Sequence, residues 1–169
     1  MFDTIAGLPL HPMVVHATEV IVPTAALVVA IAAVWPLFRR WARFLPLGIA
    51  LAALVLVPLS TQSGEALQER VRESSLVHTH VAMAEGLAPW VFGLAVVAGV
   101  LLWWNWNDAK ATPPRAPRWV ALLLSVTAVL GATGTIVQAV RIGHSGATAT
   151  WSQVAGSGSP ARSGDSDNN

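Results

Sequence analysis

Four long apolar stretches constrain the fold of this 169-residue chain more than any other feature. They cover roughly residues 13–38, 44–60, 81–104 and 119–142. An α-helix rises about 1.5 Å per residue, so about 20 apolar residues cross a hydrocarbon layer about 30 Å thick. Only 11% of the residues are charged, whereas a soluble domain carries about 25%, so too few polar side chains remain to coat four buried helices. The sequence therefore predicts an all-α integral membrane protein.

The expected architecture is a four-helix bundle with up-down-up-down topology over residues 13–152. We expect its helices at about residues 13–38, 44–63, 79–104 and 118–142, with a polar helical segment at about 64–76. Residues 1–12 are expected to form an outward-facing lead, and the polar, low-complexity residues 153–169 a disordered tail. The first stretch does not read as a signal peptide, because Asp3 replaces a basic n-region and no small-residue cleavage site follows. No internal repeat is evident in the sequence.

The basic residues and the tryptophans indicate how the bundle is oriented. Six of the ten Lys and Arg residues fall in the two loops that join the first helix to the second and the third to the fourth: Arg39, Arg40, Arg43, Lys110, Arg115 and Arg118. Six tryptophans, which anchor helices at membrane interfaces, lie at the same boundary: Trp35, Trp41, Trp103, Trp104, Trp106 and Trp119. Cytoplasmic loops carry the excess of Lys and Arg. We therefore expect both loops to face the cytoplasm and both termini to face outward.

Five histidines then gather on the outward side, each near the end of an apolar stretch: His11, His16, His78, His80 and His144. Imidazole is the commonest metal ligand in proteins, so this grouping predicts a metal or cofactor site. The chain has no cysteine, which excludes disulfides, thiolate-bound iron–sulfur clusters and covalent c-type haem. Its net charge of +1 argues against a nucleic-acid partner.

The first helix carries a polar face. Pro12, His16, Glu19 and Pro23 fall at i, i+4, i+7 and i+11, which places them on one side of a helix. An ionisable side chain at membrane depth is costly and usually faces the bundle interior. We expect His16 and Glu19 to face inward, either toward a bound group or with Glu19 protonated and hydrogen-bonded to a neighbouring helix.

The start of the third helix leaves two arrangements open. His78 and His80 lie about 200° apart around a helix, so they cannot share a face. If His78 faces inward, Glu85 comes with it; if His80 does, Met83 comes with it, and its thioether is a soft metal ligand.

The fourth helix ends with a basic residue and a glycine-flanked histidine. Arg141 is expected either to pair with Glu19, Glu85 or a haem propionate, or to extend toward the interface as a snorkelling cation. His144 is expected just past the helix, in a turn that the neighbouring glycines allow, at the rim of the bundle.

Two segments carry a family resemblance: GLPLHPMVVH at residues 7–16, and GHSGA at residues 143–147. With the histidines that open the third helix, they resemble the bacterial domain-of-unknown-function family numbered 2231, over about residues 5–152. The resemblance implies a small four-helix membrane protein of the bacterial inner membrane. Some members are fused to Rieske iron–sulfur domains, which implies membrane redox chemistry and partners in a membrane redox complex.

The family motif carries over to four positions: His11, His16, one of His78 and His80, and His144. After the second motif histidine the family usually continues with an apolar or Phe-Pro segment, whereas this chain has Ala17-Thr18-Glu19. This departure indicates that Glu19 could mark a specialised site, and that members need not all bind the same group.

Three functions fit these observations. The first is a redox subunit that binds b-type haem through His16 with His78 or His80, with Arg141 at a propionate. The second is a non-haem site for one Cu, Zn or Fe ion or a dinuclear pair, drawn from His11, His16, Glu19, His78, His80, Glu85 and His144. The third is an interaction subunit of a membrane complex, without a cofactor. No pairing of a nucleophile with a base appears, so the sequence predicts no catalytic residues.

Overall fold

The computed structural model describes residues 4–5, 8–68, 75–108 and 118–157, and this part of the chain is almost entirely helical. The helices are α1 (Leu10–Val34), α2 (Pro36–Ala42), α3 (Leu45–Gln68), α4 (Ser75–Glu85), α5 (Ala88–Asp108) and α6 (Arg118–Ser157). Before them, β1 (Thr4–Ile5) pairs antiparallel with β2 (Leu8–Pro9). The predicted all-α helical bundle is confirmed.

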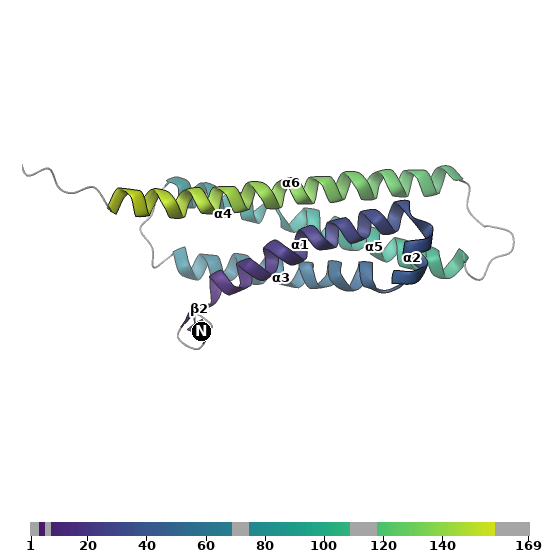
Figure 1. Ribbon diagram of the computed structural model, residues 1–169, viewed down its shortest axis with the longest axis horizontal. Coiled ribbons are helices and arrows are strands. Elements are labelled where there is room, and N and C mark those ends of the chain that lie inside the picture. Colours follow the sequence, from purple (N-terminus) through teal and green to yellow (C-terminus); the bar gives the residue numbers. More distant parts are fainter. Residues whose placement is uncertain (1–3, 6–7, 69–74, 109–117, 158–169) are drawn as a thin grey trace, which may run out of the picture.

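Four segments of the described chain are long and apolar enough to cross a membrane: His11–Val34, Leu45–Gln68, Ser75–Asn107 and Trp119–Ser152. Figure 1 shows that successive segments run in alternate directions along the long axis. We call one end of the bundle the histidine end; there α1 and α4 begin, α3 ends and the last part of α6 lies. The other, where α2 lies, is the arginine end. The side of the membrane that each end faces remains a prediction.

Small side chains make up much of the core. On α1 the fully buried residues are Val22, Ala25, Ala26, Val29 and Ala32. On α3 and α6 the buried residues are again mostly alanines, with Thr135 among them. Small residues let helix backbones approach closely, which is how helices associate in lipid. Many large apolar side chains face outward instead, as expected for lipid contact.

The arginine end is closed by a short helix. Pro36 begins α2, where the missing N–H of proline costs nothing. The Arg39 guanidinium donates to the carbonyls of Ala32 and Ala33, at 3.1 and 3.4 Å, so a cation covers the last turn of α1. Ser125 of α6 donates to the same Ala33 carbonyl at 2.9 Å. The region expected as a loop at residues 39–43 is therefore partly helical and fastened to the bundle.

The third predicted helix is divided into α4 and α5. Pro89 has no N–H to donate to the Glu85 carbonyl four residues earlier, which favours a break here. The Leu87 N–H turns to the Ala84 carbonyl at 3.1 Å. This releases the Met83 carbonyl, which accepts instead from the Gln138 side chain of α6 at 2.8 Å.

The last helix is longer than expected. α6 continues to Ser157, so His144 lies within a helix and not in a turn beyond it, and this expectation is wrong. Gly143 and Gly146 do not end the helix, because an isolated glycine costs only about 1 kcal/mol relative to alanine and because α6 packs against α1 and α4. The polar segment expected at 64–76 is helical to Gln68, and residues 69–74 lie outside the described residues. Residues 158–169 of the expected tail also lie outside them, as do Lys110 and Arg115.

Gly134 supplies a test of the packing between α5 and α6. A Cβ on Gly134 would overlap the Trp90 indole, whereas a Cβ on Gly131, one turn earlier, meets nothing. We expect Gly134→Ala to lower the unfolding free energy by about 1–3 kcal/mol through overpacking. Gly131→Ala is the matched control and should be neutral or stabilising. Thermal unfolding in detergent measures both, and equal melting temperatures for the two variants would contradict this packing.

Single cysteines test the orientation, because the chain has none of its own. Ser152 and Arg40 are both exposed and lie at opposite ends of the bundle. By the positive-inside rule, a membrane-impermeant maleimide added to spheroplasts should label Ser152→Cys at once. It should label Arg40→Cys only after the membrane is opened. The reverse pattern would invert the predicted orientation.

Candidate functional site

His80 is held by a serine on the neighbouring helix α6. Its Nδ1 lies 2.9 Å from the Ser145 Oγ, and that Oγ lies 2.8 Å from the Ile142 carbonyl. A serine hydroxyl has one proton, and a carbonyl oxygen can only accept. When the hydroxyl donates to Ile142, its oxygen accepts from His80, which places the proton of a neutral ring on Nδ1. The Nε2 lone pair of His80 is left for another partner.

His11 is held in the same way by α3. Its Nδ1 lies 3.1 Å from the Ser63 Oγ, which donates to the Ser60 carbonyl at 3.0 Å. The same proton count would place a proton on Nδ1 of His11, whose ring also reaches the Ser60 carbonyl. Two imidazoles from different helices therefore each have Nδ1 beside a serine hydroxyl, an arrangement that favours the tautomer that binds a metal through Nε2.

A glycine follows each of the two serines, and each imidazole packs against it. A Cβ on Gly64 would lie 3.0 Å from the Cε1 of His11, and a Cβ on Gly146 would lie 3.0 Å from the Cε1 of His80. A side chain at either position would push the ring by a few tenths of an ångström. The Ser-Gly pair thus supplies both a hydrogen bond and the space that the ring occupies.

The two rings lie at the same end of the bundle, the histidine end. His11 and His80 are both partly buried. They come from the beginnings of α1 and α4, which lie at the same end of the bundle in Figure 1. We call this arrangement of His11, His80 and their serines the two-histidine site.

The expectation that His16 and Glu19 face the interior of the bundle is wrong. His16 and Glu19 are exposed, and the Nδ1 of His16 is bonded to the Pro12 carbonyl of its own helix. The buried face carries Thr18 and Val22, and His11 extends this face toward the histidine end. The alanine-rich packing of α1 against α3 and α6 turns the His16 side of the helix outward.

The other expected residues lie around the site and not in it. His78 and His144 are exposed, so of the two arrangements left open for the third helix, His80 is the one that turns inward, with Met83 partly buried beside it. Glu85 and Arg141 are also exposed. Within the described chain, Arg141 forms no ion pair with Glu19 or Glu85.

Glu19 instead lies where α1 passes α6. Its Oε1 is 3.4 Å from the position that a Cβ on Gly143 would take. Among the described residues, no three of the histidine, aspartate and glutamate side chains are grouped closely enough to hold a metal ion. A site that draws on the seven expected ligands together is therefore not assembled in this structure.

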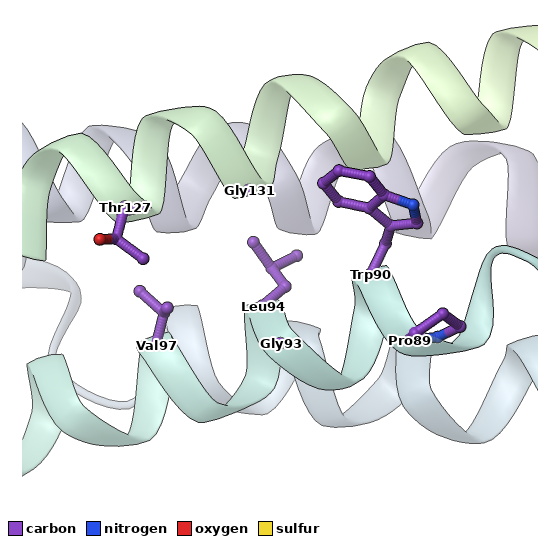
Figure 2. A pocket seen from close by; sticks show the side chains of 8 residues that line it. Pro89, Trp90, Gly93, Leu94, Val97, Thr127 and Gly131 are labelled. Atoms are coloured by element: carbon purple, nitrogen blue, oxygen red, sulfur yellow. The ribbon is translucent and has the colours of Figure 1, made fainter.

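One cavity, of about 280 Å³, lies between α5 and α6, away from these histidines. Figure 2 shows Trp90, Leu94 and Val97 of α5 extending toward α6, with Gly93 leaving the space open. Its lining is apolar apart from Thr127. The cavity contains no metal-ligating side chain, so it is separate from the two-histidine site.

Sequence reasoning missed Ser63 and Gly64. The signal was present, because the Ser-Gly dipeptide of the GHSGA segment also occurs at residues 63–64, near the end of the second span. Its meaning depends on the helix register that places His11 against it, and register between helices is not visible in a single sequence.

Comparison with known proteins gives a match to a family of predicted membrane proteins, which agrees with the four spans. No curated protein matches the chain. No solved structure matches it either. The model of one family, described as predicted membrane protein (DUF2231), matches residues 7–158, which include all four spans and both histidines of the site. The chain is a membrane protein and belongs to the family DUF2231.

Proposed function

We propose that this membrane protein binds one b-type haem between its helices, with the Nε2 atoms of His11 and His80 as axial ligands. The observation that carries the proposal is the matched surroundings of the two rings, each with its Nδ1 within hydrogen-bond distance of a serine hydroxyl. Metal-binding histidines almost always donate their other N–H to such a partner, which fixes the ring orientation. Both rings are therefore prepared to bind a metal.

The number of ligands favours haem over a bare ion held by protein alone. A structural zinc ion takes four protein ligands and a catalytic one takes three, whereas the described chain groups no three histidine or acidic side chains. Haem iron has four ligands from its macrocycle and requires only two more. Two histidines from facing helices of a bundle fit that need.

The surroundings suit a redox cofactor at the membrane interface. When bound, haem supplies one-electron transfer. His11 and His80 hold the group partly buried at the end of the bundle. Arg141 lies one helical turn before Ser145 on α6 and is exposed, so its guanidinium would be available to a propionate. Electron donors and acceptors would be partner proteins of the same membrane.

A second candidate is a soft metal ion, such as copper, between the same two histidines. Met83 favours it, because it is partly buried three residues after His80 on α4. Thioether and imidazole ligands both suit copper. In this case the protein would handle a metal ion and would not carry haem.

Alanine variants separate the two histidines of the site from the other three. In protein purified from haem-supplied cells, we expect a Soret band that His11→Ala and His80→Ala each reduce at least tenfold, because one axial ligand is lost. His16→Ala, His78→Ala and His144→Ala are matched controls and should keep the band, since these side chains are exposed. Absorbance per protein measures all five.

The outcomes distinguish the candidates. A wild-type protein without a Soret band would contradict haem binding. If elemental analysis then found about one metal ion per chain, lost in His11→Ala, the second candidate would hold. Loss of haem in His16→Ala but not in His11→Ala would instead restore the pairing expected from the sequence. Absence of both haem and metal, with co-purifying subunits lost in His80→Ala, would favour an interaction subunit.

A further inference from the structure

Six of the seven buried positions of α1 recur at the same spacing after His80; the exception is Ala33, whose counterpart Leu102 is partly buried. Counted from His11, the six lie at +7, +11, +14, +15, +18 and +21: Thr18, Val22, Ala25, Ala26, Val29 and Ala32. Counted from His80, the same six offsets give Leu87, Val91, Leu94, Ala95, Ala98 and Leu101, all of them buried. The agreement continues across the break between α4 and α5. Each histidine therefore lies at the same level above the same pattern of core positions.

The second helix of each half repeats as well. Counted back from Ser63, the positions at −10, −13 and −17 are Ala53, Ala50 and Pro46, which are buried. Counted back from Ser145, the same offsets give Thr135, Ala132 and Ala128, which are also buried. Each half is thus a helical hairpin with a histidine near the start of its first helix and a Ser-Gly pair on its returning helix.

The two hairpins run in the same direction. α1 and α4 both begin at the histidine end, while α3 and the Ser-Gly part of α6 return to it (Figure 1). Halves with the same orientation are parallel repeats, related by an axis along the membrane normal. His11 bonds to the serine of its own hairpin, and His80 does the same. Such an axis relates the two rings as equivalents.

We infer that the chain is built from two equivalent hairpins, each carrying one His–Ser–Gly half-site, and that Ser63 and Ser145 are positioning residues. Their hydroxyl oxygens keep His11 and His80 as matching Nδ1–H tautomers, so that one ligand is bound between two equivalent Nε2 atoms. The identity of that ligand rests on the proposed function, in which haem would bind both rings. The equivalence of the half-sites does not rest on the proposed function, because it is inferred from the burial pattern and the serine contacts.

The imidazole tautomers test this inference without any ligand. We would label the full chain with ¹⁵N-histidine and record long-range ¹H–¹⁵N correlations in detergent micelles. In the wild type, His11 and His80 should both show a protonated Nδ1 and an unprotonated Nε2. Ser63→Ala should shift the tautomer of His11 alone, and Ser145→Ala that of His80 alone.

Control variants keep the result specific. Thr61→Val and Thr148→Val remove hydroxyls that donate to backbone carbonyls of α3 and α6, at 3.1 and 2.9 Å, without a bond to either histidine ring, and they should change neither ring. Ser63→Thr and Ser145→Thr keep a hydroxyl at each position and should therefore keep the wild-type tautomers. An Nε2–H tautomer in the wild type, or a shift of both rings by either serine variant, would overturn the inference.

Haem titration adds a second arm. Gly64→Ala and Gly146→Ala, which push the ring of one half-site each, should weaken haem binding by similar factors, within about 10- to 100-fold. A large loss for one and none for the other would contradict equivalent half-sites. If the wild type binds no haem but shows the expected tautomers and serine effects, the proposed function fails while the inference stands.

Discussion

Close packing of α1 against α3 and α6 is the interaction on which the rest of the structure depends. In lipid there is no hydrophobic gain from bringing two apolar helices together, so association rests on van der Waals contact and on hydrogen bonds between helices. Ala25, Ala26 and Ala32 allow that contact by keeping α1 thin on its buried side. The same contact fixes the rotation of α1 and thereby turns His11, and not His16, toward Ser63.

The two-histidine site follows from that rotation and from the chemistry of a hydroxyl group. A serine in a helix can donate its hydroxyl hydrogen to the carbonyl three residues earlier, and its oxygen can then only accept from a neighbour. Ser63 and Ser145 both do so. In the site that we propose, an interaction within one helix would thus set the tautomer of a ring on another helix, in each half of the molecule.

The sequence was sufficient for the spans but not for the site. Length and composition determine that four segments can cross a membrane, because every residue contributes to that property. The choice of inward face on α1 is different, since it depends on which neighbours pack there. The presence of His16 and Glu19 on one helical face led to the wrong prediction of the inward side. The stripe of mostly small residues from Thr18 to Ala32 marks the side that is buried. The repeat stayed hidden because it lies mainly in burial and register, and only three of the nine pairs of buried positions carry the same residue.

The spin state of the oxidised protein tests the central claim most directly. Electron paramagnetic resonance of the purified full chain at low temperature should show low-spin ferric haem, because two imidazoles would bind the iron in the proposed site. His11→Ala and His80→Ala should each convert the remaining signal to high spin, and by equal extents if the two half-sites are equivalent. A high-spin signal in the wild type, or a low-spin signal that survives both substitutions, would contradict ligation by His11 and His80.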